Sequence, residues 1–223
     1  MGGLCRIRAN RSVLGCCLLL VGEAVCSSTS AEAQQLPDAG FEPPISVASF
    51  ARGAGPTVGI DEAHVNFHTM DGRYQSFARL LERDGYRVRP SSTSFARASL
   101  QTVDILVVAN AMHEQSAQEF APIPNLSAFT LAEIEEVEAW VRDGGSLLLI
   151  ADHMPIAGHA EDLAAAFGIR FHNGFVFDDE GSGMITFRRA DGSLMENDVV
   201  DGRDPSERVD SVTTFTGQGF RVD

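Results

Sequence analysis

The stretch LAEIEEVEAWVRDGGSLLLIADHMP, residues 131–155, decides the fold class of this chain. Apolar residues recur at helical spacing after Thr130 and Glu133, which form a capping-box pattern, and Gly144-Gly145 is typical of a helix end. The run from Ser146 to Ala151 predicts a strand, and the continuous apolar run from Asp104 to Ala109 has the pattern of a parallel strand that is covered on both faces. A helix followed by a strand, with polar residues directly after it, predicts an α/β domain.

The same alternation of strand and helix patterns extends in both directions and predicts a doubly wound, mostly parallel sheet with helices on both faces. Further strands are expected at Thr57 to Ile60, Tyr86 to Val88 (before Pro90), Asp104 to Ala109 and Ile169 to Phe171, and helices at Tyr74 to Asp84, capped by Gly85, and at Glu161 to Phe167. The C-terminal part predicts a β-rich extension. Its expected features are strands at Phe175 to Phe177, Ile185 to Phe187 and Val212 to Phe215, a hairpin turn at Asp191-Gly192, and a surface loop over 198–210.

The N-terminus has the pattern of an export signal. Arginines precede an apolar stretch over 13–22, and Ala31 and Ala33 place small residues where a signal peptidase reads them. We therefore predict a cleaved signal over 1–33, a linker over 34–55, a domain over 56–223, and a periplasmic or extracellular location. The apolar stretch is shorter than the roughly 20 residues that cross a bilayer, so no stable membrane insertion is expected after cleavage.

Composition excludes several classes of chemistry. All four cysteines lie in the predicted signal, so the remaining chain has no thiol nucleophile or thiolate metal ligand. The basic residues are all arginine, which excludes P-loop and Schiff-base lysines. The net charge of −14 argues against nucleic acid as a partner.

Polar residues follow several predicted strands, at the edge where an open α/β sheet binds its ligands. The predicted ligand-binding residues are Asp61, Glu62, His64, Asn66, His68, Asn110, His113, Glu114, Asp152 and His153. His64 and His68 point to the same side whether the segment is extended or helical. With Asp152 they form a candidate site for a divalent metal such as zinc, manganese or iron, with Glu62 or His153 as the candidate catalytic base.

A plainer interpretation stays open beside this one. Loops between strands and helices commonly use Asp and Asn to cap turns and His to bind backbone groups. On that interpretation Asp152 caps a turn and Asp61 fixes its loop.

The segments GIDEAHVNFHT, DILVVANAMHE and LAEIEEVEAWVRDGGSLLLIADHMPIAG, followed by EDLAAAFGI, resemble an uncharacterised family of exported bacterial proteins. Its domain is similar to class I glutamine amidotransferases and to an auxiliary domain of gliding-motility ABC transport systems. The resemblance implies a flavodoxin-like sheet. It also implies further strands and a helix after residue 223, so an incomplete C-terminal part is expected. Amidotransferase activity is not carried over, because the stretch 108–113, where the nucleophilic cysteine is expected, has none.

Together these observations favour an exported amidotransferase-like domain that binds a small polar ligand, such as a carbohydrate or cell-wall fragment, at the strand ends. A metal-dependent hydrolase is the first alternative. The second is a non-enzymatic module that binds a protein of the envelope or of a transport system.

Overall fold

The computed structural model describes residues 36–117 and 123–223. The predicted signal at 1–33, with its four cysteines, lies outside the described residues. Within the two described ranges, no helix is long and apolar enough to cross a membrane.

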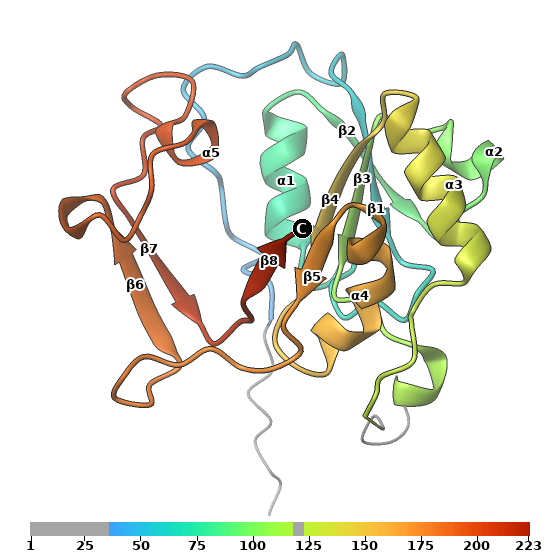
Figure 1. Cartoon of the computed structure of the whole chain (residues 1–223). Helices are drawn as coiled ribbons and strands as arrows, with labels where there is room; N and C mark the ends of the chain where they lie inside the picture. Colours follow the sequence, from blue (N-terminus) through green and yellow to red (C-terminus); the bar gives the residue numbers. More distant parts are fainter. Residues whose placement is uncertain (1–35, 118–122) are drawn as a thin grey trace, which may run out of the picture. The chain divides into compact units, whose positions relative to one another are not determined.

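A four-stranded parallel sheet forms the centre of the described chain (Figure 1). Its strands are β1 (Thr57–Asp61), β2 (Arg87–Ser91), β3 (Ile105–Ala109) and β4 (Ser146–Ile150). They are ordered β2-β1-β3-β4, and each neighbouring pair is parallel. This is the flavodoxin-like α/β arrangement that the sequence and its resemblance predict. Parallel strands place their carboxyl ends at one edge, which brings the polar residues after β1, β3 and β4 together.

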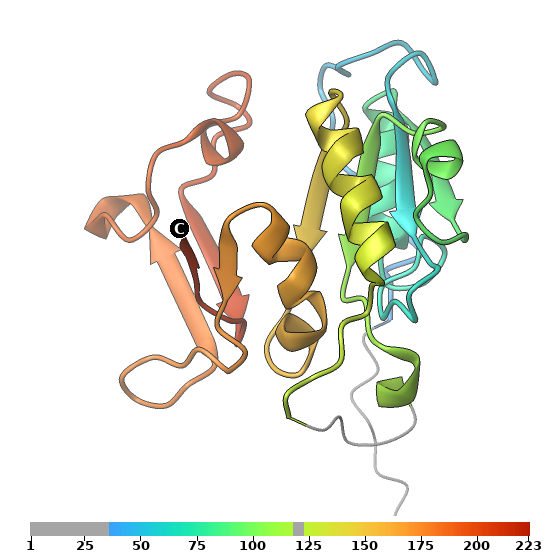
Figure 2. The same cartoon turned by 45° about the vertical axis from the view of Figure 1, so that its right-hand side comes forward.

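Helices cover both faces of this sheet, as the sequence predicts (Figures 1 and 2). They are α1 (Gln75–Arg83), α2 (Arg97–Leu100), α3 (Leu131–Arg142) and α4 (Ile156–Ala166). Successive side chains of β3 point to opposite faces of the sheet and so belong to two separate apolar cores. Leu106 and Val108 pack with residues of α2, α3 and α4, whereas Val107 packs on the opposite face with Ala78 of α1.

The capping box predicted from the sequence fixes the start of α3. The Thr130 hydroxyl accepts a hydrogen bond from the Glu133 amide at 3.3 Å, and the Glu133 carboxylate accepts one from the Thr130 amide at 2.9 Å. The helix ends before Gly144, whose φ of +109° lies in the left-handed region. Residues 131–155 therefore form the helix–strand unit that their pattern predicts.

The C-terminal part forms two small antiparallel pairs apart from the central sheet (Figure 2). Strand β5 (Ile169–Phe171) pairs with β8 (Phe220–Val222), and β6 (Met184–Arg188) pairs with β7 (Ser211–Phe215). The short elements between strands are η1 (Glu114–Ala117), η2 (Arg189–Asp191) and α5 (Asp198–Asp201). The predicted β-rich extension is confirmed.

Several predicted boundaries were wrong. Strand β2 continues through Pro90 to Ser91, because it is an edge strand, where a residue without an N–H is tolerated. Helix α4 begins at Ile156, five residues before the predicted start. The stretch 175–177 forms no strand.

The predicted hairpin turn at Asp191-Gly192 was also wrong. Gly192 ends η2 with a φ of +79°, and β6 pairs with β7 only after the long excursion 189–210. That excursion contains α5, where a loop was expected. Strand β8 has no counterpart among the predicted strands, because all three of its residues are exposed and carry no burial pattern.

Candidate functional site at the carboxyl edge of the sheet

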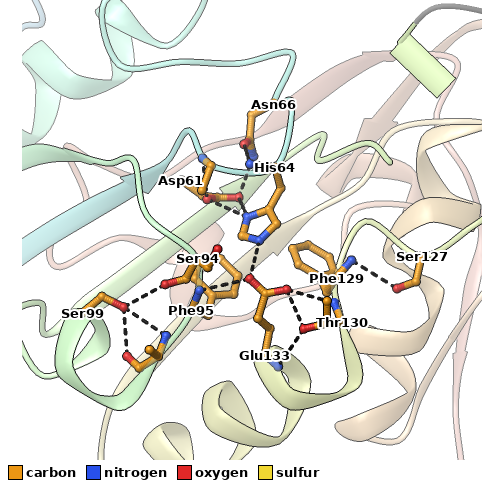
Figure 3. Close-up of polar contacts among 12 residues, drawn as sticks. Asp61, His64, Asn66, Ser94, Phe95, Ser99, Ser127, Phe129, Thr130 and Glu133 are labelled. Atoms are coloured by element: carbon orange, nitrogen blue, oxygen red, sulfur yellow. Dashed lines mark hydrogen bonds and ion pairs between the residues drawn. The ribbon is translucent and has the colours of Figure 1, made fainter. Parts of the chain in front are cut away.

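A buried histidine joins the end of β1 to the first turn of α3 (Figure 3). His64 Nδ1 lies 2.9 Å and 3.0 Å from the two carboxylate oxygens of Asp61, and its Nε2 lies 3.0 Å from Glu133 Oε1. Asp61 is fully buried, and His64 and Glu133 are 7% and 8% exposed. Two carboxylates therefore share one imidazole in the protein interior.

This arrangement requires His64 to be protonated on both ring nitrogens. A carboxylate only accepts hydrogen bonds, so each nitrogen that faces one must carry a proton. Burial alone would lower the pKa of His64, but the hydrogen bonds and charges of Asp61 and Glu133 outweigh it and raise that pKa above 6.5. Burial likewise acts to raise the pKa of Glu133, but hydrogen bonds from Thr130 and His64 hold it at about 2.

Polar partners compensate the remaining negative charge of the cluster. Asn66 Nδ2 donates to Asp61 Oδ2 at 2.8 Å, and the Phe95 amide donates to Glu133 Oε1 at 3.2 Å. Glu133 also lies in the first turn of α3, where the helix dipole favours a negative charge. The imidazole packs against the Phe95 and Phe129 rings, with ring centroids 4.4 Å and 4.8 Å away (Figure 3). The cluster is fully paired, as a buried ionic group must be to persist.

His64 is therefore a structural clamp in this conformation. Both of its nitrogens are hydrogen-bonded to carboxylates, so it has no lone pair with which to take a proton or bind a metal. The structure does not bring His64 together with His68 and Asp152 as the predicted ligand set. In residues 36–117 and 123–223, no group of three or more His, Cys, Asp or Glu side chains is arranged to hold a metal ion.

The clamp predicts how stability depends on pH. The His64 contribution is complete below pH 6.5 and is lost as pH rises through the raised folded-state pKa. The Glu133 contribution is complete above pH 4.5 and is lost as pH falls toward about 2. We expect the stabilisation to be largest between these two limits.

Urea denaturation of wild type and His64→Gln, from below pH 4.5 to well above pH 6.5, gives the free energy of unfolding of each protein against pH. The difference between the two profiles measures the effect. The subtraction removes the titration of other groups. A difference that does not decline on the alkaline side would show that His64 is not charged in the fold.

A separate pocket of about 440 Å³ lies at the same edge of the sheet, between the ends of β3 and β4 and the strands β6 and β7. Its polar wall includes His68, Tyr74, Asn110 and Asp152. The wall from β6 and β7 includes the apolar residues Ile185 and Phe187, with Val176, Thr216 and Gln218 beside them. Three predicted site residues, His68, Asn110 and Asp152, thus meet in one pocket although they are far apart in sequence.

His68 has the opposite chemistry from His64. Burial and the nearby Arg73 guanidinium lower its pKa below 6.5, against the opposing charge of Asp152, so it is neutral near pH 7. Its Nδ1 is buried and has no hydrogen-bond partner among the described residues. The Tyr74 ring lies 4.8 Å away, and burial together with Asp152 raises the pKa of its hydroxyl, which keeps it protonated. The pocket therefore offers a neutral imidazole, a phenol donor and a carboxylate.

Asn110 connects the ends of two strands. It follows β3 with a φ of +50°, a left-handed conformation that Asn tolerates better than most residues. Its side-chain Oδ1 accepts a hydrogen bond from the Asp152 amide at 3.0 Å, and its carbonyl accepts one from the Phe67 amide at 3.1 Å. Asn110 thereby sets the position of Asp152 in the pocket wall.

The other predicted site residues hold their own loops. Glu62 accepts a hydrogen bond from the Met70 amide at 2.8 Å, and His113 accepts one from the Gln115 amide at 3.2 Å. Glu114 begins η1. The His153 ring donates a hydrogen bond to the Met154 carbonyl at 2.8 Å, and it stacks on the Phe175 ring. For these residues the structure supports the plainer interpretation of loop polarity.

Sequence reasoning missed Glu133 and Tyr74. The pattern identifies Glu133 only as half of a capping box, although its second role uses the same carboxylate. Tyr74 belongs, by its spacing, to the apolar face of α1. Its position six residues after His68, a predicted ligand-binding residue, is a signal for a second role.

No protein-family model matches the sequence, and no curated protein sequence matches it significantly. A solved structure described as "mmIFT52 N-terminal domain" matches with a TM-score of 0.53 and 14% identity, over 75% of this chain and 68% of that chain. A putative ThuA-like protein from Bacteroides uniformis matches with a TM-score of 0.42 and 14% identity, over 81% and 64%. The chain shares with the first of these an α/β fold built on a parallel sheet. At this identity the likeness shows the fold alone.

The turn after β3 has a left-handed backbone and forms an elbow at the end of the strand. The resemblance places a nucleophilic cysteine in this stretch, and the elbow residue here is Asn110. An amide is no nucleophile, and this one is hydrogen-bonded to the backbone of Asp152. The elbow here supports the pocket wall.

Proposed function

We propose that the protein binds a small, hydroxyl-rich ligand, of the class of a carbohydrate or cell-wall fragment, in the pocket between His68, Asp152 and the β6 and β7 strands. The observation that carries this proposal is the pairing of a polar wall with an apolar, partly aromatic one. The proposal includes an exported location, which rests on the signal pattern of residues 1–33.

Sugars match both walls of such a pocket. Their hydroxyl groups both donate and accept hydrogen bonds, which suits the Asp152 carboxylate, a neutral imidazole at His68 and the Tyr74 phenol. Their C–H faces pack against apolar and aromatic side chains such as Ile185 and Phe187. The pocket volume of about 440 Å³ lies in the range of small-molecule sites.

The two alternatives have less support. A metal-dependent hydrolase built on His64, His68 and Asp152 would need His64 to leave Asp61 and Glu133, both of which hold it at about hydrogen-bond length. A crevice filled by its own side chains would favour the second alternative, an interaction module without a small ligand. This crevice instead keeps a volume of about 440 Å³.

Saturation-transfer NMR with a panel of neutral mono- and disaccharides, including N-acetylated ones, tests the proposal. We expect transfer to at least one sugar, and about tenfold weaker binding in Asp152→Asn, since a hydrogen bond to a charged group contributes about 1.5–3 kcal/mol. Asp143→Asn is the matched control, because Asp143 lies outside this pocket, at the end of α3. Transfer to no sugar, or equal binding by both variants, would refute sugar recognition at this site.

A further inference from the structure

A second hollow, larger than the pocket just discussed, lies away from that edge of the sheet. It has a volume of about 910 Å³ and lies between the segment 39–53, the helix α1 and the start of β2. In Figure 1 this segment belongs to the blue trace that passes beside α1. Four arginines line the hollow: Arg52, Arg79, Arg83 and Arg87. We call it the arginine groove.

Three of these arginines lack an acidic partner among the described residues. No carboxylate in that part of the chain lies within 4.0 Å of the Arg52, Arg79 or Arg87 guanidinium, whereas most of the other described arginines have one. The chain has 31 acidic residues against 17 basic ones, so carboxylates are abundant. Two glutamates, Glu42 and Glu82, also line the groove, so its four arginines leave an excess of positive charge there, and such an excess attracts anionic ligands.

The arginines of the groove already contact the chain's own segment 39–53. Arg83 Nη1 binds the Glu42 carboxylate at 2.5 Å, and Arg79 Nη1 donates to the backbone carbonyl of Ala39. Arg87 donates to the Gly53 carbonyl at 3.4 Å. The guanidinium groups thus already bind one carboxylate and two peptide carbonyls of an irregular segment, and each keeps further donors, because a guanidinium has five.

Apolar side chains complete the lining. Phe41, Tyr86 and Val88 face the same hollow as the arginines. A ligand with both carboxylates and apolar groups would satisfy both features, and an extended peptide carries them on alternate residues.

We propose that the arginine groove binds an extended acidic peptide segment of a partner protein, in which carboxylates alternate with apolar side chains. The carboxylates pair with Arg52, Arg79 and Arg87, and the apolar residues pack against Tyr86 and Val88. A long polyanion such as nucleic acid fits less well, because the rest of the surface has a net negative charge. This site is independent of the sugar pocket.

Fluorescence polarisation with a labelled short peptide of alternating glutamate and phenylalanine tests the proposal on the purified protein. The comparison peptide replaces each glutamate with glutamine. We expect binding of the glutamate peptide that weakens with added salt, and about tenfold weaker binding in the Arg52→Gln, Arg79→Gln double variant, which is a loss of about 1.4 kcal/mol. Arg142→Gln is the control, since Arg142 is an exposed arginine of α3, outside the groove.

Each result decides for or against the proposal. Loss of binding in the double variant but not in Arg142→Gln supports it. Equal affinity for the glutamine peptide, or equal binding by all variants, overturns it. Tighter binding of a single-stranded oligonucleotide that loses affinity in the same double variant would also overturn it, in favour of a general polyanion site. Circular dichroism of the double variant verifies that the fold is kept.

Discussion

Replacing Glu133 by glutamine is expected to destabilise the fold by about 3 kcal/mol, because His64 loses one of its two charge-assisted hydrogen bonds and the cap of α3 is weakened, although Asp61 still balances the imidazolium. His64 Nε2 donates to Glu133 Oε1 at 3.0 Å, and the His64 side chain is only 6% exposed, so water does not replace the lost acceptor in this conformation. Glutamine keeps the size of the side chain but only one acceptor oxygen, so its amide nitrogen faces the donors of either His64 or Thr130 and a hydrogen bond is lost together with the charge. The free energy of unfolding from urea titration measures the effect.

Glu138→Gln is the matched control for this prediction. Glu138 lies on the same helix and forms an ion pair with Arg142, but both side chains are exposed to water. Exposed pairs contribute roughly 0–1 kcal/mol, so the control should change little. An equal loss of unfolding free energy in both variants would mean that glutamine itself destabilises helix α3. The buried pair would then contribute no more than the exposed one.

The pH dependence of the Glu133→Gln loss separates electrostatics from packing. The loss should be largest where His64 is charged, and should shrink as pH rises through its raised pKa. A loss due to altered packing would be the same at every pH. A pH-independent loss would therefore contradict the assignment of His64 as an imidazolium.

The sequence predicts the central sheet because each of its elements carries a local signal. The apolar run Asp104 to Ala109 and the capping box at Thr130 are patterns that depend on neighbours in the chain. The topology then places His68, Asn110 and Asp152 at one edge, because parallel strands end together. That much of the site follows from local patterns and one rule of topology.

The remaining features depend on contacts between distant residues. The bond from His64 to Glu133 spans 69 positions, and the same capping-box pattern forms without it. The apolar wall of the pocket comes from β6 and β7, whose pairing skips the excursion 189–210. Strand β8 has only exposed residues, so its pairing with β5 leaves no periodic signal. Such features need the packed structure, because no local pattern encodes them.

Replacing Gly85 by alanine is expected to destabilise the fold by about 3 kcal/mol, from backbone strain and a steric clash together. Gly85 follows α1 with a φ of +97°, where an L side chain is strained. A Cβ at this position would lie 2.3 Å from the Phe50 carbonyl oxygen, which is a backbone atom that no rotamer change can move. The Gly85 carbonyl also accepts a hydrogen bond from the Gly55 amide at 2.9 Å, so the segment beside it is held close. Urea denaturation of the variant measures the loss.

Gly144→Ala isolates the strain from the clash. Gly144 has a similar φ of +109° after α3, but nothing beyond its own chain neighbours lies within 4 Å of the place that an alanine Cβ would take. We expect a loss of about 1 kcal/mol there, which is the cost of the left-handed backbone alone. The excess in Gly85→Ala then measures how tightly the segment around Phe50 is held against the end of α1. Because that segment forms one wall of the arginine groove, equal losses in the two variants would show that the wall yields easily, and the groove would then have no fixed shape to recognise a peptide.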